Sequence, residues 1–167
     1  MTIIAGNLPD AVVRQAAAEG QAILGADFVA QTGLEEPLSE AAQRTLEAEL
    51  IGAHCGMDVG LVSEMVTGQR IWDAAMADAL ARTANATGMG VILIAGSGHT
   101  RNDRAVPVVL DRLRPNAAVA ALAFIEVAVG FNGPRDYAPF FLTDGLPYDY
   151  VWFTPGESTG APAARCG

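Results

Sequence analysis

The chain has 167 residues, 51% of them hydrophobic and 17% charged, which suits one domain with a sizeable core rather than two domains. Its formal net charge of −9 repels phosphate backbones and therefore argues against a nucleic-acid partner. All ten basic residues are arginine, so a P-loop lysine, a Schiff-base lysine and a lysine nucleophile are excluded.

No apolar run approaches the roughly 20 residues of a membrane-spanning helix, and the first residues lack the pattern of a signal peptide. Cys55 and Cys166 are far apart, and we interpret both as free thiols. A single domain over residues 1–167 is expected, with a flexible tail over 156–167 that is rich in Gly, Ala and Pro.

The first half of the chain predicts one strand and then several helices. Residues 2–5 are apolar and β-branched, and a helix is expected from near Pro9 to Gly20. Residues 25–38 lack periodicity and predict a loop, with at most a short helical turn. Ser39 is the expected N-cap of a helix that ends near Cys55, and Asp58 that of a longer helix to about Thr87.

The second half predicts further strands that alternate with a helix. A buried parallel strand at 91–95, a helix at 106–113, a strand within 117–129, an irregular loop at 130–148 and a last strand at 150–154 are expected. This alternation predicts an α/β fold with a mainly parallel sheet flanked by helices. The helical pair of about 39–87 would be inserted between strands.

The most informative stretch is Gly96-Ser97-Gly98-His99-Thr100-Arg101, directly after the predicted strand at 91–95. Ligands bind at the carboxyl ends of parallel strands, which makes His99 a candidate site residue. The pattern is not a Rossmann fingerprint, because Arg101 replaces the third glycine, and Ser97 is not in a nucleophile elbow. Asp103 is a possible N-cap of the next helix and a possible partner of Arg101.

Two further groups carry chemistry. His54 falls at a predicted helix end, where capping of free carbonyls is the preferred interpretation and a role as ligand or proton carrier is the alternative. Gln69 and Asp73 are four residues apart, so they share one helix face and can address one partner. For Asp73, a salt bridge to an arginine and a functional role are equally weighted.

These motifs together resemble the ChaN-like haem-binding uptake family of the Tiki superfamily. The similarity rests on His54-Cys55-Gly56-Met57, on Gln69 with Trp72-Asp73 and Met76, on Gly96 to Arg101 with Val106-Pro107, and more loosely on Tyr148 to Phe153. Family members usually begin with a strand ending in Gly-Glu-x-His. This chain has no such motif, so the resemblance implies that the first βα unit is missing.

The resemblance implies an α/β protein of haem and iron uptake, located in the cell envelope or periplasm, that can form a homodimer. The expected cofactor is haem, with Tyr137, Tyr148, Tyr150 or a histidine as axial ligand. The implied cofactor-binding residues are His54, Met57, Gln69, Asp73, His99, Arg101 and Asp103. The alternatives are a metal-dependent hydrolase, in which His54 and His99 bind a divalent ion with Asp73 or Asp103, and a non-catalytic remnant.

Overall fold

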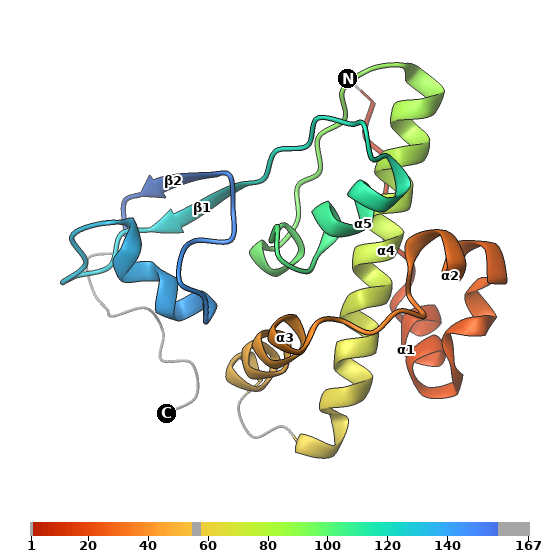
Figure 1. Ribbon diagram of the computed structural model, residues 1–167, viewed down its shortest axis with the longest axis horizontal. Helices are drawn as coiled ribbons and strands as arrows, with labels where there is room; N and C mark the ends of the chain where they lie inside the picture. The colour runs from red at the N-terminus through yellow and green to blue at the C-terminus, as the bar shows by residue number, and fades with distance from the viewer. Residues whose placement is uncertain (1, 55–57, 157–167) are drawn as a thin grey trace.

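The structure is a computed structural model, and it describes residues 2–54 and 58–156. In the described ranges a group of helices lies beside a small two-stranded sheet (Figure 1). The α-helices are α1 Asp10–Glu19, α2 Ala26–Thr32, α3 Glu40–Ala53, α4 Val62–Thr87 and α5 Val106–Leu113. The 3-10 helices are η1 Gln21–Leu24, η2 Val59–Leu61, η3 Ser97–His99 and η4 Pro134–Phe141, and the strands are β1 Leu122–Glu126 and β2 Tyr150–Thr154.

The 26-residue helix α4 forms the centre of the helical part, and α1, α3 and α5 all pack against it (Figure 1). Ile71 and Ala74 of α4 are fully buried in a cluster with Val13 of α1. Further along α4, Met76 and Ala77 are buried against α5. The apolar stripe that predicted this long helix therefore packs against α1 in one part and against α5 in another.

Local capping chemistry defines the helix ends, as predicted. The Ser39 hydroxyl accepts a hydrogen bond from the Ala42 N–H at 3.2 Å and begins α3. The Asp58 carboxylate accepts from the Gly60 N–H at 2.9 Å and begins the turn η2, which continues directly into α4. Gly88 ends α4 in the left-handed conformation, with φ of 65°.

The region 25–38, predicted as a loop with at most a helical turn, contains more helix than expected. Helix α2 covers seven residues there, and it ends at Gly33, which has a φ of 71°. Val29 is buried in the cluster shared with α1 and α4. The tertiary contacts of α2, rather than any periodicity of its short sequence, stabilise this helix.

The sheet is smaller than predicted. Strands β1 and β2 form at the predicted places and pair in parallel, with Leu122 opposite Tyr150 and Phe124 opposite Trp152. Residues 2–5 and 91–95 were expected to be strands, but neither has a strand partner among the described residues. Ile92 is 88% exposed and Ile94 is 94% exposed, so the prediction of a strand buried on both faces is wrong here. An apolar run alone cannot form a β-strand, because the backbone hydrogen bonds of a strand require an adjacent strand.

The segment between the two strands is mostly irregular. The predicted irregular loop 130–148 contains the 3-10 helix η4 and is otherwise without regular structure. No helix within the described ranges has both the length and the apolar composition to cross a bilayer. The predicted tail, except Gly156, and Cys55, Met57 and Cys166 lie outside the described residues.

Candidate functional site

The candidate site lies where α3, α4 and the turn at 96–101 meet. Helix α4 contributes Gln69 and Asp73, whose spacing places both side chains on one face of the helix, as predicted. The turn begins where the extended segment 91–95 ends, and its 3-10 helix η3 presents His99 to that face. Helix α3 contributes Glu49, which binds the arginine that follows the turn.

The His99 ring is held by two side chains of α4. Its Nδ1 lies 2.7 Å from Oδ1 of Asp73 and 3.0 Å from the amide nitrogen of Gln69, which also lies 3.5 Å from Nε2. The Trp72 ring packs edge-on against the imidazole, with 6.4 Å between ring centroids. In the neutral ring, donation of the Nδ1 proton to Asp73 leaves Nε2 with its lone pair. Nε2 is then an acceptor with the Gln69 amide as its 3.5 Å neighbour, and the His99 side chain keeps 21% exposure.

Asp73 is the least exposed carboxylate of the site, at 3%. Burial raises its pKa from 3.8 to about 6, although the hydrogen bond and charge of His99 oppose this rise. Its partner is therefore the histidine and not an arginine, which was the structural alternative for this residue. A carboxyl group whose pKa is raised by burial and that contacts an imidazole makes this group a candidate functional site.

Arg101 has no contact with solvent, and its guanidinium is fully engaged by the protein. Asp103 accepts from its Nε at 2.9 Å and from its Nη2 at 2.7 Å, in a bidentate pair. Glu49 accepts from Nη1 at 3.2 Å, and the Phe141 carbonyl accepts from Nη2 at 3.1 Å. The predicted pairing of Arg101 with Asp103 is confirmed. Because all three guanidinium nitrogens are bound, Arg101 supports the turn and does not face a ligand.

The same contacts change the interpretation of Asp103. Its carboxylate is not the N-cap of the following helix, since Ala105 holds that position without a side-chain cap. Partial burial opposes ionisation, but the hydrogen bonds and charge of Arg101 prevail and lower the pKa of Asp103 below its ordinary value. Asp103 is thus the counter-ion of a buried arginine, and the prediction that it caps α5 is wrong.

Glu49 is the residue that the sequence analysis missed. Its Oε2 accepts hydrogen bonds from Arg101 and from Arg104, which is itself almost fully buried. A Cβ placed on Gly98 would lie 3.2 Å from Oε1 of Glu49, so the backbone of the turn approaches this carboxylate closely. Arg101 and Arg104 are the sequence feature that could have indicated such a residue. Two arginines that become buried need carboxylate partners, although the sequence does not say which carboxylate.

The three tyrosines considered as iron ligands have different surroundings. Tyr148 reaches the turn, and its hydroxyl donates to the Ser97 carbonyl at 3.2 Å, while burial raises its pKa. The Tyr137 hydroxyl is buried and accepts from the Ala128 N–H at 2.9 Å. Tyr150 lies on β2 and is 65% exposed. Only Tyr148 of these three touches the turn that carries His99 in the described structure.

His54 lies at the C-terminal end of α3, where its Nδ1 is 2.9 Å from the Leu50 carbonyl oxygen. This is the helix-end contact that its position favours. In the described structure no hydrogen bond joins His54 to the His99 group, and Met57 falls outside the described residues. Within residues 2–54 and 58–156 no three His, Cys, Asp or Glu side chains are grouped so that they could hold a metal ion.

Comparison with known proteins places the chain in a family. No curated protein and no solved structure matches it significantly. The sequence profile of the family described as haem-binding uptake, Tiki superfamily, ChaN matches residues 1–110, which is 110 of the 167 residues and includes the whole turn with His99. The chain therefore belongs to the ChaN-like haem-binding uptake family of the Tiki superfamily.

Proposed function

We propose that this protein binds haem in haem uptake and that His99 is the ligand of the haem iron. The observation that carries the proposal is the His99–Asp73 contact of 2.7 Å in a chain of a haem-binding family. The hydrogen bond fixes the ring by Nδ1 and leaves Nε2 as a nitrogen donor. An imidazole that gives its other N–H to a carboxylate is a more basic and better oriented metal ligand.

The His99 ring is accessible to a haem, but Arg101 is not accessible to a haem propionate. The ring is partly accessible from outside, so that a ligand can reach it, and Trp72 gives it an aromatic neighbour. A salt bridge from a haem propionate to Arg101 does not fit, because that guanidinium is buried and bound to Asp103 and Glu49. Arg101 and Asp103 therefore act in this proposal by holding the turn in place.

The residues of the chain have separate roles. His99 provides the donor atom, Asp73 holds its proton at Nδ1, and Gln69 flanks the ring and limits its rotation. When bound, haem would supply an iron centre with an open coordination position for the imidazole. The family's role in uptake supports a location in the cell envelope or periplasm, and a homodimer belongs to the same proposal.

A haemin titration tests the ligand assignment. The wild-type chain should give a saturable, shifted Soret band, and His99→Ala should lose it or move it to the position of free haemin. His54→Ala is the matched control, since it removes the other histidine of the chain, and it should leave the band unchanged. Asp73→Asn should keep the band but weaken binding roughly 10–100-fold, because the carboxylate only orients the ligand.

Two results would overturn the proposal. A wild-type chain without a saturable Soret shift would remove haem binding altogether. A band that survives in His99→Ala but is lost in Tyr148→Phe or Tyr150→Phe would move the iron ligand to a tyrosine. Thermal unfolding of each variant shows whether it is folded under the conditions of the titration.

A further inference from the structure

A small cavity of about 130 Å³ lies between α4, α5 and the segment 33–38. Three arginines line this arginine cavity together: Arg70 of α4, Arg104 of the turn before α5, and Arg112 of α5. Asp73 lines it as well, so the cavity adjoins the His99 group. It has room for about four water molecules, which suits a small ion or molecule and excludes a whole haem.

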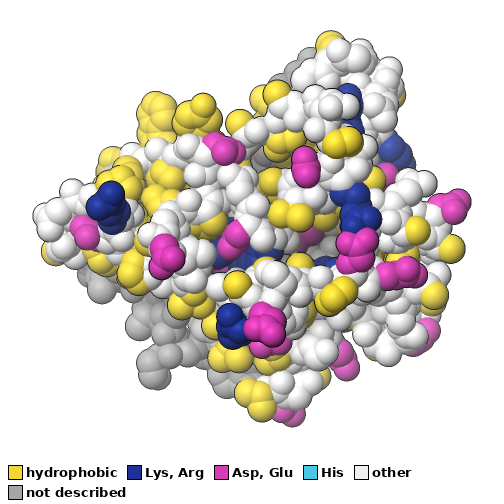
Figure 2. All heavy atoms as spheres, viewed as in Figure 1, with side chains coloured by type: hydrophobic (Ala, Val, Ile, Leu, Met, Phe, Trp, Pro, Cys, Tyr) yellow, Lys and Arg dark blue, Asp and Glu magenta, His cyan; other side chains and the backbone are white. Residues whose placement is uncertain are grey.

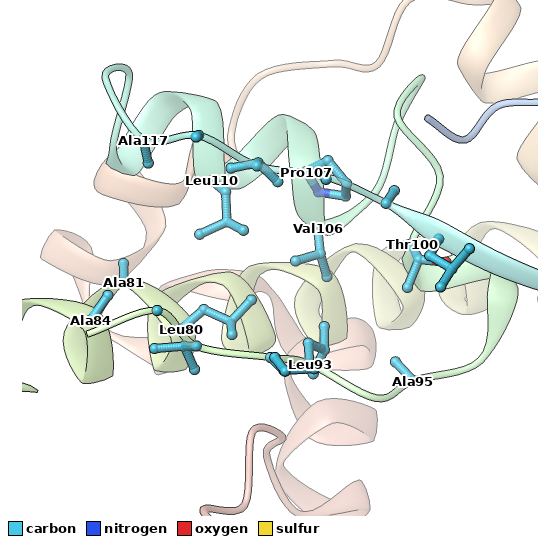
Figure 3. Close-up of a pocket in the computed structure, with 18 of the residues that line it drawn as sticks. Leu80, Ala81, Ala84, Leu93, Ala95, Thr100, Val106, Pro107, Leu110 and Ala117 are labelled. Atoms are coloured by element: carbon cyan, nitrogen blue, oxygen red, sulfur yellow. The ribbon is translucent and has the colours of Figure 1, made fainter. Parts of the chain in front are cut away.

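The arginine cavity is distinct from a larger groove of about 740 Å³ beside β1 (Figure 3). The groove is mostly apolar, and Arg114 is the one charged side chain among its lining residues in the described structure. The groove and the arginine cavity have no lining residue in common. The groove is lined by Leu80, Ala81 and Ala84 of α4, Val106 and Leu110 of α5, Leu122 and Phe124 of β1, and the extended segments 89–95 and 117–122.

Two arginines of the cavity have N–H groups without a partner in the described structure. The Nε of Arg104 is buried and has no hydrogen-bond partner, although Nη2 of the same guanidinium donates to Glu49. Arg70 donates only from Nη2, to the carbonyl oxygens of Gly33 at 3.4 Å and Glu36 at 2.5 Å. Because a buried N–H without an acceptor is unfavourable, an acceptor that enters the cavity would stabilise this arrangement.

The charges of the same two arginines are incompletely compensated. Burial lowers the pKa of Arg70 and of Arg104, and the nearby carboxylates do not restore it. Arg101 provides the contrast, because burial opposes its charge but Asp103 and Glu49 prevail and raise its pKa. A negatively charged group in the arginine cavity would give Arg70 and Arg104 the kind of partner that Arg101 already has.

The lining favours a carboxylate with a short hydrocarbon chain over a phosphate or a sulfate. Asp73 and Glu36 also line the cavity, so a doubly charged anion would face two carboxylates. A carboxylate carries a single charge, and its two oxygens match the fork of a guanidinium. The apolar part of the wall is available to a hydrocarbon chain and includes Leu34, Val108 and Val109.

We propose that the arginine cavity binds the carboxylate of a short-chain acid, with Arg70 and Arg104 on the carboxylate and α5 against the chain. The acid is either a free molecule or a group on a larger ligand, such as a propionate of a haem bound at the neighbouring His99. The proposal does not rest on haem binding, because the contacts that carry it belong to the cavity alone.

A titration with sodium propionate, observed by ¹H–¹⁵N NMR at neutral pH, tests the proposal. The buried Nε–H of Arg104 exchanges slowly with solvent, so its side-chain signal is observable, and its absence in Arg104→Lys assigns it. Propionate should shift this signal saturably, with a dissociation constant in the millimolar range because the ligand is so small. Propionamide, which has the same shape without the charge, should bind at least about tenfold more weakly.

Variants of the protein locate the binding. Arg70→Met should weaken propionate binding about tenfold or more. Arg82→Met is the matched control on the same helix, since Arg82 forms an exposed pair with Asp78, and it should leave the binding unchanged. Val108→Phe should block the cavity, and because Val108 is 45% exposed the larger side chain does not disturb the core. Circular dichroism confirms that each variant is folded.

A haemin titration with and without saturating propionate distinguishes the two sources of the carboxylate. An increase in the dissociation constant of haemin would show that a haem propionate occupies the cavity, whereas an unchanged constant would assign the cavity to a free acid. The two proposals fail separately, because the NMR titration contains no haem and the Soret band does not report on the cavity.

The proposal is wrong if propionate produces no saturable shift beyond that of sodium chloride at the same ionic strength, since the cavity would then hold only water. Equal binding of propionamide and propionate would show that the guanidinium charges are not used. Tighter binding of inorganic phosphate than of propionate would assign the cavity to another class of anion. A loss in Arg82→Met as large as in Arg70→Met would place the binding elsewhere.

Discussion

At the level of single residues, the site is a set of polar groups that satisfy one another around the turn at 96–101. Asp73 and Gln69 hold His99, while Glu49 and Asp103 hold Arg101. The first group is partly open, with 21% exposure of the His99 side chain and a Gln69 contact of 3.5 Å at Nε2, whereas the second is closed around a fully buried guanidinium. The proposed ligand binding and the structural support therefore fall on neighbouring but different residues.

The raised pKa of Asp73 predicts a specific pH dependence of stability. Because the folded pKa of about 6 exceeds the ordinary 3.8, the stabilising contribution of Asp73 is fully present below pH 4 and is lost as the pH rises through 6. The unfolding free energy of the wild type, minus that of Asp73→Asn, should thus fall by on the order of 3 kcal/mol between pH 4 and pH 7. Urea unfolding at four pH values measures this difference. A difference that stays constant or rises would contradict the assignment of burial as the main cause.

Replacement of Arg101 should be costly because it leaves two carboxylates with one arginine. Arg101→Met would leave Glu49 and Asp103 facing Arg104 alone, and we expect a loss of roughly 3–5 kcal/mol in unfolding free energy. Arg44→Met is the matched control, since Arg44 forms an exposed pair with Glu40 on α3, and it should cost less than about 1 kcal/mol. Similar losses in the two variants would show that the buried cluster does not support the fold.

At the level of elements, helix ends were predictable because their chemistry is local. Ser39, Asp58 and Gly88 act within a few residues of themselves, through side-chain caps or a left-handed φ. The conformation of residues 91–95 was not predictable in the same way. Its apolar sequence is compatible with a buried strand, but pairing depends on a neighbour that the local sequence does not specify. The short helix α2 was likewise underestimated, because its stability comes from Val29 packing in the cluster with α1.

The N-cap of α3 provides a test at this level. Ser39→Ala removes the oxygen that accepts from the Ala42 N–H, and it should lower the unfolding free energy by about 1 kcal/mol. Ser39→Asp should retain most of the stability, because a carboxylate can accept the same hydrogen bond. The haemin dissociation constant should change little in Ser39→Ala, although the thermal midpoint falls, because Ser39 caps α3 and does not contact His99. A cost as large for Ser39→Asp as for Ser39→Ala would rule out the capping role.

At the level of the whole molecule, the described chain combines a well-packed helical part with a sheet that is open. Helix α4 has neighbours along its length, whereas Phe124 and Trp152 stand side by side on the sheet and are 68% and 63% exposed. Figure 2 shows hydrophobic side chains gathered over the part of the molecule that carries the two strands. Large exposed apolar surfaces on folded proteins are typical of regions that another molecule or segment covers. The groove beside β1 is continuous with that surface.

The sequence by itself determined the long helix α4, the helix caps, the positions of the strands β1 and β2 and the shared helix face of Gln69 and Asp73. These features depend on periodicity and on contacts between residues close in the chain. Only the tertiary structure decided that the partner is His99, that Glu49 neutralises Arg101 and Arg104, and that residues 91–95 border an open groove. Those contacts join residues between 26 and 55 positions apart, and their geometry follows from how the helices pack rather than from any local pattern.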